Sequence, residues 1–166
     1  AKPSWPTVFN IQYDDKNIYV AFRGYDGEPS KIAVMSGKRD EQVGDMMGVT
    51  FDSYRDFRTG FEFTLTAWGQ KAFLILFNPM DWDFNWDPVW KGKTGLEDSA
   101  WVAEMEIPLS QLRYGPQDEQ VWGIHAWRWI ARNQEESQGQ LIPRQNTGRM
   151  YQLGELRGIR GLPRSR

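Results

Sequence analysis

Residues 7–23 read Thr-Val-Phe-Asn-Ile-Gln-Tyr-Asp-Asp-Lys-Asn-Ile-Tyr-Val-Ala-Phe-Arg. Polar and apolar side chains alternate on both sides of a polar group, residues 14–17, whose composition is typical of a turn. Alternation with a period of two indicates a β-strand, because successive side chains of a strand point to opposite faces. The stretch therefore predicts a β-hairpin with strands at residues 7–13 and 18–23.

Similar strand-length segments follow along the chain. They are rich in β-branched or aromatic residues, are separated by turns, and occupy residues 31–36, 45–53, 60–67, 71–77, 100–107 and 121–132. Only residues 108–113, which begin with proline, have a helical pattern, and they span about one turn. The sequence therefore predicts an all-β fold, an antiparallel β-sandwich that is jelly-roll-like and has at most one short helical turn.

The longest predicted strand, residues 121–132, has aromatic side chains on both faces. One face carries Trp122, Ile124, Ala126, Arg128 and Ile130, and the other carries Gly123, His125, Trp127 and Trp129. We expect one face to cover the core and the other to line an outer surface. Glu104 and Glu106 would form ion pairs with Arg128 and Arg132 if their strands were neighbours.

Composition places the chain among ordinary globular proteins. Its 166 residues correspond to one domain, so we expect residues 1–166 to form a single β-sandwich. The 40% hydrophobic residues, 25% charged residues and formal net charge of -2 are not those of a disordered or fibrous chain. Basic residues form no stripe along the sequence, so nucleic acid is not an expected partner.

Few residues are suited to catalysis or to transition metals. The chain has no cysteine, which excludes disulfides, thiol catalysis and cysteine-type zinc sites. Its one histidine, His125, accompanies no G-x-S-x-G motif, and the Glu104–Glu106 pair is more typical of ion pairs than of glycoside hydrolysis. We therefore expect no enzymatic activity. A remote alternative is haem, ligated by His125 and one of Met46, Met47, Met80 and Met105, although a packed histidine is favoured.

In the segment from residue 81 to residue 90, oxygen-bearing and aromatic side chains alternate over the first seven residues, up to Pro88. Clustered hard oxygens suit calcium, and the candidate ligands are Asp81, Asp83, Asn85 and Asp87. An EF-hand is excluded, because Trp86 stands where that loop needs glycine and Gly92 stands where it needs glutamate. A solvated acidic loop is the other interpretation of this segment.

The aromatic content of the chain favours a binding surface. Nine Trp, nine Phe and six Tyr are present, and many of the Trp lie in polar, turn-rich segments. The C–H faces of sugars stack on indole rings while polar side chains bind the hydroxyl groups. The predicted sugar contacts are Trp82, Trp86, Trp90, Asn85 and Arg128. The alternative is that these Trp side chains are buried beneath the loop.

The ordered set of segments resembles family 9 carbohydrate-binding modules, in particular the branch found ahead of a larger outer-membrane-type region in bacterial surface proteins. The segments are Tyr13-Asp14-Asp15, residues 18–22, Arg39-Asp40, Asp45, Phe51-Asp52, residues 86–90, residues 101–108, residues 112–114, residues 122–124 and residues 154–159. The resemblance implies a jelly-roll-like sandwich, a sugar slot flanked by Trp, bound calcium in some members, an exported location and no catalysis. The expected partner is a polysaccharide or oligosaccharide.

The chain departs from this family in two respects. The family opens with an Ile-Asp-Gly segment leading to a Trp, and this chain begins just after that point, so we expect it to be part of a longer protein and to lack the first strand. The sugar-gripping Trp pair is not identified, because Trp68, Trp127 and Trp129 are candidates besides the three Trp of the loop. An alternative function is therefore an interaction or scaffold domain of a larger surface or outer-membrane protein, without sugar binding.

Overall fold

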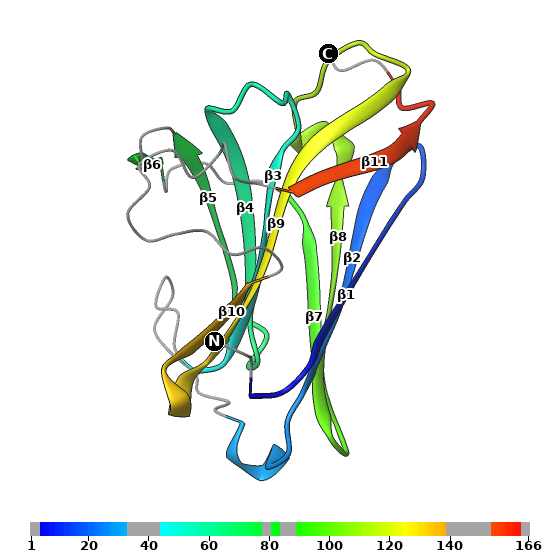
Figure 1. The fold of residues 1–166 in the computed structure, drawn as a ribbon. Helices are drawn as coiled ribbons and strands as arrows, with labels where there is room; N and C mark the ends of the chain where they lie inside the picture. Colours follow the sequence, from blue (N-terminus) through cyan, green and yellow to red (C-terminus); the bar gives the residue numbers. More distant parts are fainter. Residues whose placement is uncertain (1–3, 33–43, 78–80, 84–88, 139–153, 164–166) are drawn as a thin grey trace.

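The computed structural model describes residues 4–32, 44–77, 81–83, 89–138 and 154–163, which form two antiparallel β-sheets packed face to face (Figure 1). The small sheet has four strands, in the spatial order β1 (Thr7–Tyr13), β2 (Asn17–Tyr25), β8 (Ala100–Pro108) and β7 (Lys91–Glu97). The predicted β-sandwich is therefore confirmed.

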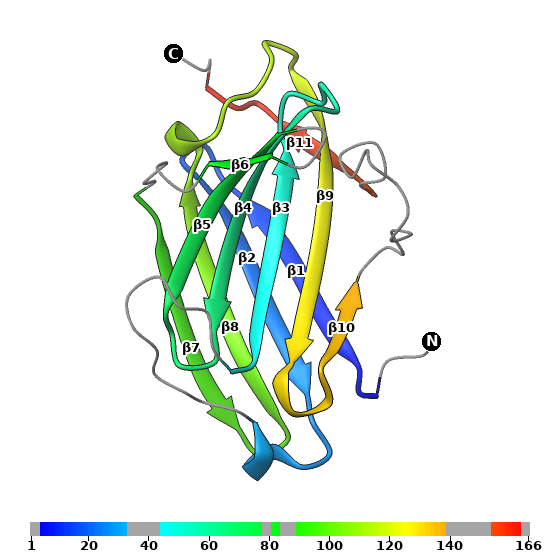
Figure 2. The same cartoon turned by 90° about the vertical axis from the view of Figure 1, so that its left-hand side faces the viewer.

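The large sheet has seven strands. Their spatial order is β10 (Glu135–Gln138), β9 (Glu119–Ile130), β3 (Met46–Asp52), β4 (Thr59–Thr66), β5 (Lys71–Phe77) and β6 (Asp81–Asp83), and β11 (Gly154–Arg160) is the seventh. β3 pairs with one edge of β9, while β10 and β11 pair with successive parts of its other edge. Figure 2 looks onto the outer face of this sheet, with the small sheet behind it.

The first hairpin forms because Asp14 closes its turn. Oδ1 of Asp14 accepts hydrogen bonds from the backbone N–H groups of Lys16 (2.8 Å) and Asn17 (2.7 Å), and Oδ2 accepts one from the Tyr19 hydroxyl (2.7 Å). The bond from Tyr19 and the two backbone donors hold the pKa of Asp14 below its ordinary value. β1 and β2 consequently pair from end to end without a bulge, as predicted.

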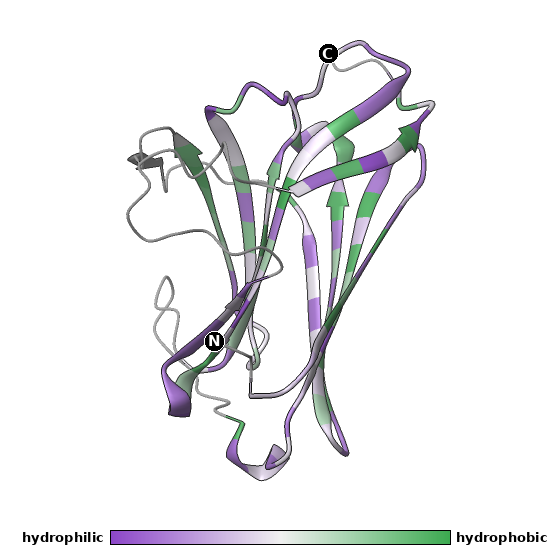
Figure 3. Ribbon diagram, viewed as in Figure 1, coloured by the Kyte–Doolittle hydropathy of each residue, from purple (hydrophilic) through white to green (hydrophobic). Residues whose placement is uncertain are grey.

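The core fills the space between the sheets with alternate residues of each strand. In Figure 3 the strands accordingly alternate hydrophobic and hydrophilic positions. Trp101 and Trp122, one from each sheet, are fully buried; Trp101 packs on Phe22 at 4.6 Å between ring centroids, and Trp122 meets the edge of Phe51 at 6.0 Å. The face of β9 that carries Trp122 is thus the core face.

The helical content differs slightly from the prediction. The predicted turn at residues 108–113 is present as the 3-10 turn η2 (Leu109–Gln111), and two others, η1 (Pro29–Lys31) and η3 (Ala131–Asn133), were not predicted. Lys31, expected to start a strand, belongs to η1, and residues 33–36 of that predicted strand lie outside the described residues. No helix in the described part of the chain is long and apolar enough to cross a membrane.

The predicted ion pairs of Glu104 and Glu106 with Arg128 and Arg132 are wrong. β8, which carries the glutamates, belongs to the small sheet, whereas Arg128 lies in β9 of the large sheet and Arg132 lies in η3 directly after it. Glu106 instead lies 3.5 Å from the Lys91 ammonium on β7, and Glu104 stands opposite Lys93. Both glutamates therefore project from the outer face of the small sheet.

Candidate binding face

The outer face of the large sheet collects polar and aromatic side chains from β3, β4, β9 and β10. Met47, Val49 and Phe51 of β3 lie in the core, so the residues between them point outward. The strand registers place two rows side by side on that face. One row is His125, Thr50 and Glu62, and the next is Gln138, Trp127, Gly48 and Thr64.

Trp127 occupies the space above Gly48. A Cβ at Gly48 would lie 2.4 Å from Cε2 and Cζ2 of the indole and 2.6 Å from its Nε1, closer than real Cβ contacts come. The backbone of Gly48 has ordinary strand geometry. Glycine is therefore required here because it has no side chain, and not because of its backbone conformation. The indole can lie across β3 only because residue 48 is glycine, and it remains part-exposed there.

Glu62 fixes the orientation of the indole. Its Oε1 accepts a hydrogen bond from Nε1 of Trp127 (2.9 Å) and another from Oγ1 of Thr50 (3.0 Å). Glu62 is only 8% exposed and Thr50 only 2%. A buried carboxylate that accepts two side-chain donors holds both in place, since either bond would be costly to lose in a desolvated site.

Further polar groups surround Trp127. Gln138 stands directly opposite it on β10, and Thr64 lies beyond Gly48 on β4. Trp129, two residues along β9 on the same face, is also part-exposed. The arrangement of an oriented indole among hydroxyl, amide and carboxylate groups has the chemistry of a site for a neutral polyhydroxylated ligand.

Asp52, at the end of β3 on this face, is fully buried and held by the following loop. Its carboxylate accepts backbone N–H bonds from Asp56 (3.3 Å) and Phe57 (3.0 Å). Burial nevertheless raises the pKa of Asp52 above its ordinary value, against the effect of these bonds. The loop therefore anchors the C-terminal end of β3.

Trp90 is not placed as predicted for a sugar contact. It is 3% exposed within the core and meets Phe63 edge to face at 5.3 Å between ring centroids. Its backbone carbonyl accepts a hydrogen bond from Nζ of Lys71 at 2.9 Å, and the same ammonium lies 5.4 Å from the ring centroid. Trp90 is a core residue, which was the alternative interpretation.

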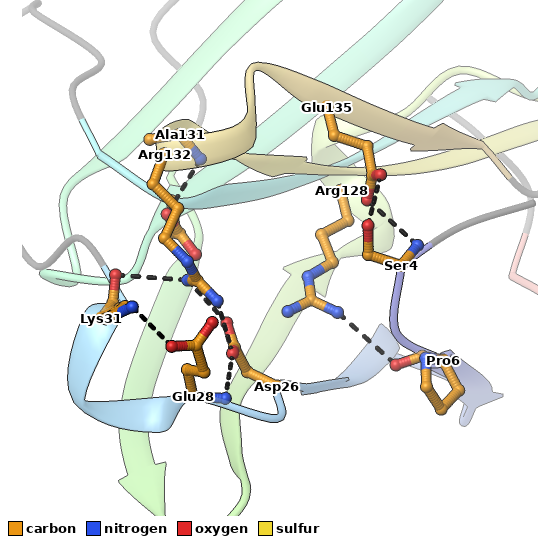
Figure 4. A network of polar contacts seen from close by, with 10 residues as sticks. Ser4, Pro6, Asp26, Glu28, Lys31, Arg128, Ala131, Arg132 and Glu135 are labelled. Atoms are coloured by element: carbon orange, nitrogen blue, oxygen red, sulfur yellow. Dashed lines mark hydrogen bonds and ion pairs between the residues drawn. The ribbon is translucent and has the colours of Figure 1, made fainter.

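Arg128 is also buried rather than available to a sugar, because its position on β9 puts it on the core face. Its side chain is fully buried between the sheets, and Nη1 donates to the Pro6 carbonyl at 3.5 Å (Figure 4). Nη1 also donates to Oγ1 of Thr7 at 3.3 Å. Burial lowers the pKa of the Arg128 guanidinium, and the nearby carboxylates of Asp45 and Asp26 oppose that shift. Arg128 therefore makes contacts within the protein interior and is not exposed to a ligand at the surface.

A second arginine near Arg128 ties the two sheets together. Arg132 donates to both carboxylate oxygens of Asp26, at 2.7 and 2.9 Å (Figure 4). Its guanidinium carbon also lies 4.7 Å from the ring centroid of Trp5. Burial alone would raise the pKa of Asp26, but the Arg132 bonds and the backbone N–H of Glu28 outweigh it and lower the pKa. This network closes the end of the sandwich.

The other predicted site residues belong to residues 81–88. The structure shows the backbone of Asp81–Asp83 as β6, in which Trp82 pairs with Leu76 of β5. Residues 84–88, and with them Asn85, Trp86 and Asp87, lie outside the described residues. Among the residues whose side chains are described, no group of three or more His, Asp or Glu could hold a metal ion. The calcium and Trp predictions for this segment stay predictions.

The haem prediction relied on His125 and nearby methionines. His125 lies on the outer face of the large sheet and is 2% exposed, whereas Met47 and Met105 lie in the core on the other side of the backbone. Met80 lies outside the described residues. No shared site for His125 and either core methionine is formed in the described structure.

The chain matches known proteins in its structure but not in its sequence. No family model matches the sequence. No curated protein matches it either. Solved structures, however, match across most of the chain.

Two of these are family 9 carbohydrate-binding modules from Caldicellulosiruptor kristjanssonii. One, in complex with cellotriose, superposes with a TM-score of 0.57 at 16% identity over 83% of this chain and 65% of the other. The second, in complex with glucose, has a TM-score of 0.57 at 15% identity over 83% of this chain and 66% of the other. This chain thus spans slightly less than two thirds of either of those chains.

A third match is a protein from Bacteroides uniformis ATCC 8492 named as a candidate carbohydrate-binding protein. Its TM-score is 0.67 at 13% identity over 92% of this chain and 78% of the other. At such low identity the likeness concerns the fold. The chain therefore has the sandwich fold of family 9 carbohydrate-binding modules.

Proposed function

We propose that this chain, which has the fold of a family 9 carbohydrate-binding module, binds a neutral oligosaccharide or polysaccharide without catalysing its cleavage. The observation that carries the proposal is the Trp127 indole, which lies over Gly48 and is held by Glu62 on the outer face of the large sheet. A preoriented, part-exposed aromatic ring loses little conformational freedom when a ligand stacks on it.

Sugar binding at this face would combine two kinds of contact. The C–H face of a pyranose ring packs against the indole of Trp127, with Trp129 extending the aromatic surface along β9. Hydroxyl groups of the sugar bond to polar neighbours on the same face, of which Gln138 stands closest in register to Trp127. Binding should therefore depend on hydroxyl geometry as well as on apolar contact.

The ligands of the matching modules suggest which sugars to try first. Cellotriose and glucose are bound by the two Caldicellulosiruptor kristjanssonii modules. We propose β-linked glucose oligosaccharides as the first ligand class, with xylose- and mannose-based chains as comparisons. The wider setting, an exported protein that carries this domain beside a larger surface or outer-membrane region, is part of the same proposal.

Residues 81–87 offer an addition to this site. We propose that Trp82 and Trp86 add stacking surface and that Asp81, Asp83, Asn85 and Asp87 either bond to hydroxyl groups or hold calcium that shapes the segment. The support is the alternation of carboxylate or amide side chains with aromatic ones in the sequence.

The test is calorimetric titration of the intact protein with cello-, xylo- and manno-oligosaccharides, with calcium and again with a chelator. Trp127→Ala is the test variant, and Trp68→Ala, which removes an indole that is 58% exposed in the turn after β4, is the matched control. We expect loss of about 2 kcal/mol or more of binding free energy for Trp127→Ala, roughly thirtyfold in affinity, and no change for Trp68→Ala.

Equal effects of the two substitutions would contradict a site at Trp127. If no oligosaccharide bound to the folded protein, the proposal would be replaced by the alternative of an interaction domain within a larger surface protein. A loss of affinity on chelation would implicate the acidic segment in binding.

A further inference from the structure

The outer face of the small sheet, which points away from the large sheet (Figure 1), has a hollow over β1, β2 and β8. The volume of this hollow is about 260 Å³. Ligand pockets of proteins begin at about 300 Å³, so the hollow suits one small ring rather than a long chain. It lies on the opposite side of the sandwich from Trp127.

Ala21 forms the floor of the hollow. The strand registers place it between Asn10 of β1 and Glu104 of β8. It alternates with Val20 and Phe22, which lie in the core, so its exposed methyl group points outward. β2 is paired along both edges, so the floor lies inside the sheet and not at its edge. The space above it exists because the side chain of residue 21 is small.

Two valines add apolar surface beside this floor. Val8 of β1 and Val102 of β8 line the hollow from the next row of residues along the strands. Val8 is 52% exposed, and Val102 is half-buried. Among the described side chains that point outward into the hollow, none is aromatic. A ligand here would therefore meet methyl groups, which can pack against a C–H face but cannot stack as a ring does.

Asn10 and Glu104 supply hydrogen-bonding groups on opposite sides of Ala21. Both side chains are exposed, and within the described structure neither makes a hydrogen bond or an ion pair. Because neighbouring strands lie about 5 Å apart, the Cα atoms of Asn10 and Glu104 are separated by about 10 Å. The amide can donate and accept, and the carboxylate accepts through two oxygens. One hydroxylated ring above Ala21 could reach both groups.

The charges around the hollow are balanced. Arg23, which lines it, forms an ion pair with Glu97, which also lines it. Glu104 stands opposite Lys93 of β7, so a cation offsets its charge without occupying its oxygens. An anionic ligand would find no unpaired cation inside the hollow, and a cationic ligand would be repelled by Lys93. The charge distribution therefore favours a neutral ligand.

We infer that this hollow is a second sugar site, separate from the face that carries Trp127, and that it binds a single neutral pyranose unit. The C–H face of the sugar packs on Ala21 and the two valines, and hydroxyl groups on opposite edges of the ring bond to Asn10 and Glu104. A wholly apolar ligand would remove water from these two polar groups without replacing its hydrogen bonds, which is costly. Because no aromatic ring stacks on the sugar, we expect weaker affinity here than at Trp127.

A site-resolved titration by nuclear magnetic resonance tests the inference on the unmodified protein and on Trp127→Ala. The probes are the methyl β-glycosides of glucose, xylose and mannose. Backbone amide signals of Ala21 and Glu104 report on the hollow, and that of Gly48 reports on the large sheet. We expect saturable shifts at Ala21 and Glu104 with at least one sugar, and we expect them to persist in Trp127→Ala.

The position of the shifts separates this inference from the proposed function. Shifts on the large sheet alone overturn the second site and leave the site at Trp127 in place. Shifts on the small sheet alone support the second site and contradict the one at Trp127. If none of the sugars shifts the signals of Ala21 and Glu104, the inference is overturned.

Matched substitutions identify the residues that hold the sugar. Ala21→Leu fills the floor, and Asn10→Ala and Glu104→Ala each remove a hydrogen-bonding group, so each should lower affinity at the hollow about tenfold or more. The controls are Gln12→Ala and Glu106→Ala, which lie two residues further along the same strands, on the same face and outside the hollow. Equal losses for each variant and its control would overturn the inference.

The charge of the ligand provides the final test. Methyl glucoside should bind to the hollow at least as tightly as methyl glucuronide, which is anionic, or methyl glucosaminide, which is cationic. Tighter binding of either charged sugar at Ala21 and Glu104 would overturn the neutral ligand class.

Discussion

Gly48 lies directly beneath the indole of Trp127, with no room for a methyl group between them. Gly48→Ala should therefore displace the indole and weaken glycan binding about tenfold, which corresponds to ~1.4 kcal/mol. Gly95→Ala is the control, since a Cβ there would meet Val102 at an ordinary 3.6 Å. Calorimetric titration of both variants measures the effect, and unchanged affinity for Gly48→Ala would argue against Trp127 as the stacking residue.

Glu62 holds Trp127 and Thr50 with one carboxylate oxygen. Glu62→Ala leaves both donors without this acceptor in a desolvated site, so we expect the free energy of unfolding to fall by about 1–3 kcal/mol and glycan affinity to fall with it. Glu62→Gln keeps an oxygen acceptor and should cost less in both. Chemical denaturation and titration test this order, and a larger loss for glutamine than for alanine would contradict it.

Trp90 lies in the core and not on the binding face. Trp90→Phe should lower the free energy of unfolding, because it reduces packing against Phe63, and it should leave glycan affinity unchanged. Urea unfolding and titration of the same preparation test both parts. If the Trp90→Phe variant were fully folded at the assay temperature and still bound glycan more weakly, Trp90 would be supported as a sugar contact.

Asp26 should make stability depend on pH in the acid range. Its pKa in the folded protein lies below the ordinary value, so its bonds with Arg132 stabilise the fold above the unfolded-state pKa, about 3.9, and that stabilisation is lost as pH falls through the lower folded pKa. Asp26→Asn should reduce stability at neutral pH and weaken this dependence. The measurement is urea unfolding at neutral pH and at about pH 3. A variant whose pH dependence matches that of the unmodified protein would exclude this role.

The sequence predicted the strands in which burial on one face imposes alternation. β1, β2, β3, β4, β5, β8 and β9 all fall within a few residues of their predicted positions. β7 was missed because its sequence, Lys-Gly-Lys-Thr-Gly-Leu-Glu, contains one large apolar residue, and its edge position does not require more. β10, with Glu-Glu-Ser-Gln, gave no apolar pattern for the same reason.

The candidate site was predicted only in part. Alternation in β9 correctly separated Trp127 from Trp122, and it also put Arg128 on the core face, although a sugar contact was predicted for it. The meeting of Trp127 with Gly48 and Glu62 joins three strands far apart in the sequence. Their mutual register depends on tertiary pairing, which no local pattern in the sequence reports.

The hydrogen bond from Trp127 to Glu62 limits how a ligand can be recognised. Because Nε1 of Trp127 already donates to Glu62, the indole offers a stacked sugar its ring face and no hydrogen-bond donor. Sugars that stack equally well would then be distinguished only by the polar side chains around the indole, such as Gln138 and Thr64. Substitution of those neighbours would alter which sugar is preferred, whereas substitution of the indole would alter how tightly any sugar is held.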